Sequence, residues 1–186
     1  MASTRDSLLS SSTASAPSAK WASAVSSPCT PEFADKPTAI QLLKLSGFSP
    51  IITTASLKHT DFLKTRGATH VVDRNLSADA LTAEIRKITQ EPVKVIYDAV
   101  ASDETQNVAY DILALGGALA HVKRDAIKPE KKMPEKKAFF VYGDVNIPPH
   151  RKLGASLYLK LTALLEDGAL KVCTLLALGL TRLHLT

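Results

Sequence analysis

Residues Ala39–Asp73, AIQLLKLSGFSPIITTASLKHTDFLKTRGATHVVD, alternate between helix-forming and strand-forming segments. An apolar helix is predicted to begin at Ala39 and to end at Gly47, because glycine commonly closes helices. The run Ile51–Thr54 is apolar or β-branched throughout, which is typical of a strand covered on both faces. The first part of this stretch therefore predicts a helix followed by a buried strand.

The second part of the stretch repeats the pattern. A short helix is predicted to begin after Ser56 and to end at Gly67, and Val71 and Val72 then start another strand. Helices and strands that alternate over so few residues indicate βαβ units. The fold class predicted is therefore α/β, with a parallel sheet.

The alternation continues along the chain. Ser77 is a predicted N-cap, and the apolar residues of the helix after it recur at helical spacing on one face. No internal repeat is present, and the α/β order comprises about five strands and about five helices. The further helices are expected at 77–89, Thr105–Leu115 and Leu153–Leu165, and the further strands at Val93–Val100, Ala118–Val122 and Ala138–Tyr142.

Composition divides the 186 residues into three parts. Residues 1–37 are rich in Ser, Ala and Pro, so we expect a disordered leader that buries too little apolar surface to fold. A transit peptide is the alternative, although no arginine-rich amphipathic pattern supports it. Residues 38–171 are predicted to form a partial cofactor-binding domain. Residues 172–186 form an atypical apolar tail.

Bulk chemistry excludes several classes of protein. The net charge of +5 comes from basic residues spread over several segments, which is typical of a solvated surface. Cys29 and Cys173 are the only cysteines, so a cysteine zinc site and a disulfide framework are not expected, and we expect a cytoplasmic protein. No segment reaches the length of a membrane-spanning helix. Nucleic-acid binding through the charged loop Lys123–Lys137 is the weakest alternative.

A set of segments, in this order and with natural spacing, resembles the medium-chain dehydrogenase/reductase superfamily. The resemblance runs from Ala39 to Lys171, and the branch it is most similar to is that of the fungal, zinc-independent enoyl reductases and quinone-oxidoreductase-like proteins. It implies a Rossmann-type domain with helices on both faces of the sheet, NADP as cofactor, and hydride transfer to an activated double bond or carbonyl. The segments are AIQLLKLSGF, IITTAS, FLKTRGA, VVD, VIYDAV, LALGGALAHV, FFVYGDVN and LLEDGALK.

Two departures from the family lead us to expect a truncated domain. The segment Cys29–Thr38 contains no glycine, although the family has a strand and a glycine-rich turn for the cofactor pyrophosphate before the AIQL helix. We therefore expect the first, central strand and the glycine-rich turn to be missing, which makes NADP binding doubtful. Nor does the chain contain the half that forms the substrate pocket in the family, so we expect no turnover from the isolated chain.

The resemblance also suggests partners. Relatives often dimerise through the edge strand of the cofactor domain, which corresponds here to Ala138–Tyr142. A homo- or hetero-oligomer through this edge is therefore expected. The alternative function is a non-catalytic module that associates with a full-length relative. A small-molecule cofactor is the expected ligand, with no nucleic acid and no membrane among the partners.

Three residues are candidates for cofactor binding. Ser56 ends the second family strand and Lys58 follows it, so a hydroxyl and an ammonium group would sit at a helix N-terminus, a favourable seat for a phosphate. No acidic residue stands there to repel the 2′-phosphate of NADP, and the resemblance implies that the Ser and Lys contact it. Arg74, after the VVD strand, is a further candidate. The alternatives left open are a plain helix cap with a solvated lysine, and an exposed turn arginine.

No catalytic or metal-binding residues are predicted. Asp98 and Asp103 suggest paired carboxylates, but we expect Asp98 to order the end of its strand instead. Val122 and Tyr142-Gly143 occupy places where the family's backbone passes the nicotinamide, and we interpret them as strand ends. The histidines have no Cys, Asp or Glu at metal-ligand spacing. They are His59, His70, His121, His150 and His184.

Overall fold

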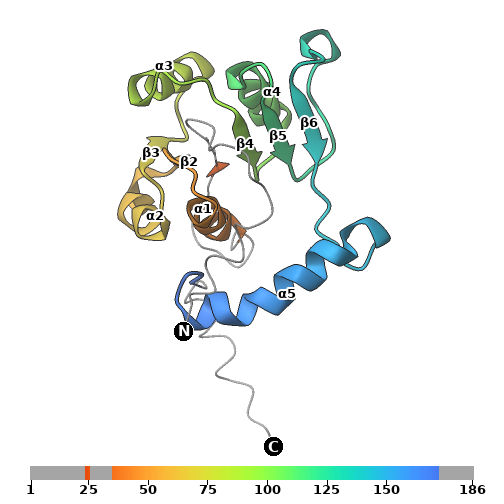
Figure 1. Cartoon of the computed structure of the whole chain (residues 1–186). Coiled ribbons are helices and arrows are strands. Elements are labelled where there is room, and N and C mark those ends of the chain that lie inside the picture. Colours follow the sequence, from red (N-terminus) through yellow and green to blue (C-terminus); the bar gives the residue numbers. More distant parts are fainter. Residues whose placement is uncertain (1–23, 26–34, 172–186) are drawn as a thin grey trace, which may run out of the picture.

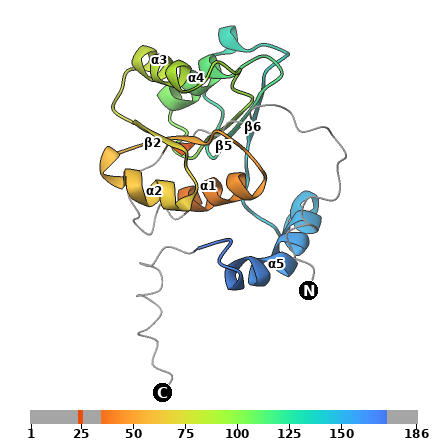
Figure 2. The same cartoon turned by 60° about the vertical axis from the view of Figure 1, so that its left-hand side comes forward.

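In the computed structural model of the chain, the residues described are 24–25 and 35–171. They form a parallel sheet of six strands in the order β3-β2-β1-β4-β5-β6 (Figure 1). Figure 2 shows α1 and α2 on one face of the sheet and α3 and α4 on the other. The predicted α/β class with a Rossmann-like parallel sheet is confirmed.

The observed elements agree with the predicted ones to within a few residues, apart from β1. Short 3₁₀ turns lie at Leu57–His59, Pro129–Lys131 and Pro148–His150. The strands are β1 (Ala24–Val25), β2 (Ile52–Ala55), β3 (His70–Asp73), β4 (Val95–Asp98), β5 (Ala118–His121) and β6 (Lys137–Phe140). The helices are α1 (Asp35–Leu45), α2 (Thr60–Arg66), α3 (Ala78–Ile88), α4 (Asp103–Ile112) and α5 (Arg151–Glu166).

The expectation that the central strand is missing was wrong. β1 lies between β2 and β4, and Ala24 pairs in parallel with both Thr53 and Tyr97. This strand could not be predicted, because an Ala/Ser-rich segment lacks the apolar run by which a buried strand is predicted. β1 falls within the predicted leader. Residues 35–37 of the predicted leader belong to α1. Its residues 1–23 and 26–34, which include most of the glycine-free stretch, and the tail 172–186 lie outside the described residues.

Alternation along β2 divides the apolar interior into two cores. Successive side chains of a strand point to opposite faces, so Ile51 and Ala55 pack with Ile40 of α1, whereas Ile52 packs with residues of α3, α4 and β4. All four residues of β2 are buried, as the apolar and β-branched run predicted. The sheet is therefore covered on both sides, which is typical of a parallel sheet.

Two helix ends were predicted correctly from single residues, whereas the start of α4 was not. Gly67 follows α2 with φ +115°, and the Ser77 hydroxyl accepts a hydrogen bond from the Ala80 amide, both as predicted. Helix α4 begins at Asp103 rather than Thr105, because Ser102 and Thr105 form a reciprocal capping box. The helix start is therefore set by a pair of hydroxyl residues.

The segment after α5 is hydrogen-bonded to α1 and α2 through Lys171. Gln41 is buried, and its side chain donates to the Lys171 carbonyl (3.2 Å) and accepts from the Lys171 amide (2.7 Å). The Arg66 guanidinium donates to the same carbonyl at 3.1 Å. Most of α5 lies away from the sheet (Figure 2). No helix of the described ranges has the length and apolar content needed to cross a membrane.

Replacing Gly67 with alanine is expected to destabilise the domain by about 1–2 kcal/mol, because an L-residue is strained at positive φ. The added Cβ would also lie 2.7 Å from Cδ of the Lys44 side chain. Gly143 is the matched control, since its added Cβ meets nothing within 4 Å and its φ is not positive. Urea unfolding gives the free energy of unfolding of both variants. Equal losses of stability for the two would contradict the requirement for glycine at position 67.

Candidate functional site

The carboxyl ends of β2, β3 and β4 meet at one edge of the sheet. In open α/β sheets ligands bind at this edge, where the strand order reverses. Here the reversal lies between β1 and β4, since the order runs β3-β2-β1 on one side and β4-β5-β6 on the other. The candidate residues Ser56 and Arg74 follow β2 and β3 at this edge.

The structure brings Ser56 and Arg74 side by side. Ala55 pairs with Asp73 at the ends of β2 and β3, and the Arg74 amide donates to the Ala55 carbonyl at 3.0 Å. Neighbouring strands lie about 5 Å apart, so Ser56 and Arg74, the residues that directly follow Ala55 and Asp73, are neighbours as well. Ser56 is half-buried, whereas Lys58 and Arg74 are exposed. The Ser56 hydroxyl and Arg74 therefore lie at one corner of the edge, and Lys58 follows in the turn after Ser56.

The helix after Ser56 differs from the expectation. Leu57–His59 is a 3₁₀ turn, and the α-helix begins only at Thr60. Ser56 holds the N-cap position of the turn, but its hydroxyl makes no capping hydrogen bond. The expected phosphate seat on a capped helix N-terminus is therefore not formed. What remains for a phosphate is the uncapped Ser56 hydroxyl and the two side-chain cations.

Asp98 orders the end of β4, as predicted. Its carboxylate is buried and accepts hydrogen bonds from the amides of Val100 (3.0 Å) and Ala101 (2.8 Å). It also accepts from the Thr105 hydroxyl at 2.7 Å. Ala101 has φ +50°, a left-handed conformation that these bonds hold in place. This carboxylate is fully used in shaping the turn that leads into α4.

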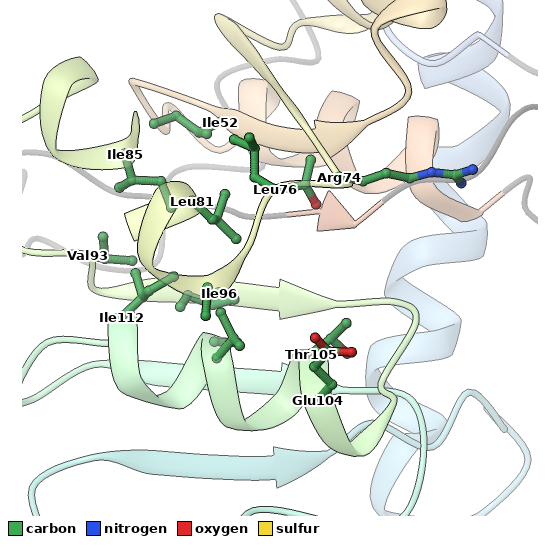
Figure 3. A pocket seen from close by; sticks show the side chains of 14 residues that line it. Ile52, Arg74, Leu76, Leu81, Ile85, Val93, Ile96, Glu104, Thr105 and Ile112 are labelled. Atoms are coloured by element: carbon green, nitrogen blue, oxygen red, sulfur yellow. The ribbon is translucent and has the colours of Figure 1, made fainter. Parts of the chain in front are cut away.

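A cavity of about 150 Å³ opens beside this edge, between the sheet and helices α3 and α4. Figure 3 shows Arg74, Glu104 and Thr105 at the end of the cavity where the strand arrows terminate. The sequence did not predict Glu104 and Thr105, because their role depends on the start of α4. The other walls are mainly aliphatic: Ile52, Leu76, Leu81, Ile85, Val93, Ile96, Val108 and Ile112.

One hydroxyl in the cavity wall is unusual. Thr54 is 2% exposed, lines the cavity, and its Oγ1 atom finds no hydrogen-bond partner in the part of the chain that the structure describes. Ile52 and Thr54 are two residues apart on β2 and so face the same side. A buried hydroxyl without a partner costs about 1–3 kcal/mol, so this position is costly for the fold.

The other residues considered from the sequence lie at or beyond the ends of strands. Val122 follows β5 and Tyr142 lies beyond the end of β6. His121 is buried at the end of β5, where Nδ1 lies 2.7 Å from the Lys123 carbonyl oxygen. Its ring lies 6.5 Å from that of Phe140. Among the described residues no group of three or more His, Cys, Asp or Glu could hold a metal ion.

The sequence of residues 38–142 matches the family model described as zinc-binding dehydrogenase, which covers more than half of the chain. The chain belongs to this family. The expected membership of the medium-chain dehydrogenase/reductase superfamily is thereby confirmed. The family's name refers to zinc, whereas the resemblance noted from the sequence is to its zinc-independent enoyl reductase branch.

Known relatives confirm that branch. Trans-enoyl reductase FSL5 of Gibberella zeae is 36% identical over 121 residues, 64% of this chain and 29% of that protein. Trans-enoyl reductase cghC of Chaetomium globosum is 34% identical over 80 residues, 43% of this chain and 20% of that protein. The chain thus spans less than a third of the length of either relative.

Solved structures share the fold. The CurK enoyl reductase superposes with a TM-score of 0.64 at 18% identity, over 83% of this chain and 46% of that one. A mycobacterial protein solved with NADPH gives a TM-score of 0.66 at 18% identity, over 91% and 53% of the two chains. A putative enoyl reductase domain of a polyketide synthase gives 0.62 at 22% identity, over 83% and 85%. At these identities the likeness concerns the fold of the cofactor domain.

Replacing Thr54 with valine, which has the same shape, should stabilise the dehydrogenase domain by about 1 kcal/mol because it removes the unpaired buried hydroxyl. Thr53 provides the matched control: it is buried on the same strand, and it is engaged in an interaction. Thr53→Val should therefore give no such gain. Chemical unfolding of both variants measures the difference, and a loss of stability in Thr54→Val would contradict this account of the site.

Proposed function

We propose that the chain is the cofactor-binding part of an NADPH-dependent reductase of the enoyl reductase branch. The proposal rests on one observation, the adjacent Ser56 and Arg74 at the carboxyl edge of β2 and β3 with Lys58 close by in sequence. The residues that end β2 include no acid. The carboxylate of Asp73, which pairs with Ala55 at the end of β3, accepts a hydrogen bond from the Asn75 amide. When bound, NADPH supplies a hydride to an activated double bond or carbonyl.

The residues present suit the 2′-phosphate of the cofactor. Arginine and lysine form charge-assisted hydrogen bonds with phosphate oxygens, and a serine hydroxyl donates a further bond. Ser56 has a hydroxyl that no cap uses, and the side chains of Lys58 and Arg74 are exposed toward solvent. These three residues would bind the cofactor through its 2′-phosphate and thereby orient it.

The cavity mouth continues the same edge toward the start of α4. Thr105 and Glu104 face Arg74 across the mouth (Figure 3). Arg74 of the loop that follows β3, and Glu104 and Thr105 next to the loop that follows β4, would hold the base of a bound NADPH. Both of these loops border the mouth. The capping box and the buried Asp98 hold the second of these loops rigid, which lowers the entropy lost on binding.

The reaction itself needs more than this chain provides. The chain spans less than a third of the length of trans-enoyl reductases FSL5 and cghC. None of the described residues is placed as a nucleophile, acid or base. We therefore propose that the isolated chain does not turn over substrate. As part of the same proposal we place the protein in the cytoplasm.

Binding is tested by titrating NADPH and NADH against the purified chain, followed by nicotinamide fluorescence and thermal shift. Arg74→Ala and Lys58→Met should each weaken NADPH about tenfold, since a lost charge-assisted bond is worth about 1.5–3 kcal/mol. Neither should change the affinity for NADH, which lacks the 2′-phosphate. Lys87→Met is the control, because Lys87 pairs with Glu84 in the last turn of α3. An equal loss of affinity for NADPH and NADH would contradict the proposal that Lys58 and Arg74 bind the 2′-phosphate.

Turnover is tested separately by following NADPH oxidation with several enones and quinones. The isolated chain should show a rate no higher than that of buffer. A clear, protein-dependent rate would refute the proposal of inactivity while leaving the binding site intact.

A second candidate function is that of a non-catalytic module that pairs with a full-length relative or with itself. β6 is the outer strand of the sheet, and Phe139, Phe140 and Tyr142 are each about half-exposed, at 50%, 50% and 53%. The rings of Phe140 and Tyr142 contact one another with centroids 6.0 Å apart. An exposed apolar edge strand is a template for pairing with another strand.

Sedimentation velocity tests this second function. We expect a dimer of the chain, or a complex with an intact relative, that Phe139→Lys abolishes because a charge would be buried in the joint. Leu159→Lys is the control, since Leu159 is exposed on α5 away from β6. A monomer that binds no relative, or an assembly unaffected by Phe139→Lys, would contradict it.

A further inference from the structure

Helix α5 is largely uncovered by the rest of the described chain. It lies away from the sheet (Figure 2), and of its 16 residues only Gly154 and Leu164 are buried. Leu159 lies five residues from each of them, which is about 1.4 turns, so it points to the opposite side of the helix. With 84% of its surface exposed, Leu159 is the most exposed large apolar side chain among the described residues. The outer face of α5 is therefore centred on Leu159.

This outer face is symmetric about Leu159. Small residues stand three and four positions away on either side, and opposite charges stand seven positions away. Residues at these spacings share one side of a helix. An antiparallel second copy centred on Leu159 would therefore set small residues against small residues and lysine against glutamate. The other residues of the outer face are Lys152, Ala155, Ser156, Thr162, Ala163 and Glu166.

The charges of α5 also favour an antiparallel neighbour. Its first turn carries Arg151 and Lys152 and no acid, and its last turn carries Glu166 and no base. A helix dipole is stabilised by the reverse arrangement, with acids at the amino end and bases at the carboxyl end. Within the described part of the chain no ion pair neutralises these three residues. An antiparallel helix would bring its Glu166 beside Lys152 and would thereby compensate both ends.

We propose that the outer face of α5 binds the same face of a second copy of this chain, related by a two-fold axis at Leu159. Such an interface is isologous, so each contact occurs twice. The small residues let the two helices approach closely, and the two Leu159 side chains are buried between them. A pair of Lys152 and Glu166 lies at each end. This interface goes beyond the proposed function, since it uses neither Ser56 and Arg74 nor β6.

Sedimentation velocity of the full chain at increasing concentration tests the pairing. The chain carries Phe139→Lys, so that β6 does not contribute to assembly, and it should still form a dimer through α5. Adding Leu159→Lys should abolish this dimer, because two like charges would meet at its centre. Leu153→Lys is the matched control, since Leu153 is 72% exposed on the same helix but lies outside the outer face. In this control the dimer should persist.

Exchanging charges provides a second test. Lys152→Glu and Glu166→Lys should each weaken the dimer about tenfold, since each turns two attractive pairs into repulsive ones. An equimolar mixture of the two variants should associate as tightly as the parent chain, because the mixed dimer restores both pairs. Neither substitution should lower the thermal stability of the dilute chain, since each suits the helix dipole better.

Three results would overturn the proposal. The first is a monomer at every concentration, which would mean that another partner or another part of this chain covers the outer face. The second is a dimer that survives Leu159→Lys. The third is a mixture of the two charge variants that associates no more tightly than either variant alone.

Discussion

The backbone of Ala24 joins the two halves of the sheet. It pairs with Thr53 of β2 on one side and with Tyr97 of β4 on the other, so β3-β2 and β4-β5-β6 form a single layer. Without this link the inner edges of β2 and β4 would be unpaired between two apolar cores, and buried backbone groups without partners are costly. The alignment of strand ends that creates the candidate site depends on it.

The same alignment explains why the candidate site lies where it does. Because all strands run parallel, the residues after β2, β3 and β4 reach one edge, where Ser56, Arg74 and the start of α4 come together. Two buried features behind that edge differ in kind. Asp98 has all its hydrogen bonds made and only shapes a loop, whereas Thr54 has an unused hydroxyl. The first stabilises the loop before α4, whereas the second costs the fold stability.

The sequence predicted elements correctly where a hydrophobic pattern is bounded by residues that begin or end a helix. The buried run in β2, the glycine after α2 and the serine before α3 all gave correct elements, because each is a local signal with its own physical cause. The strand β1 escaped prediction because its pairing involves backbone atoms that any residue supplies. The 3₁₀ turn after Ser56 and the capping box at Ser102 depend on short-range geometry that spacing alone does not reveal.

The account is tested most directly by NMR measurement of backbone contacts around Ala24. It predicts cross-strand Overhauser effects from residue 24 to the backbones of both Thr53 and Tyr97, with slow amide exchange in all three strands. Effects to one side only, or direct contacts between β2 and β4, would contradict a continuous sheet and with it the shared edge on which the proposed cofactor site depends.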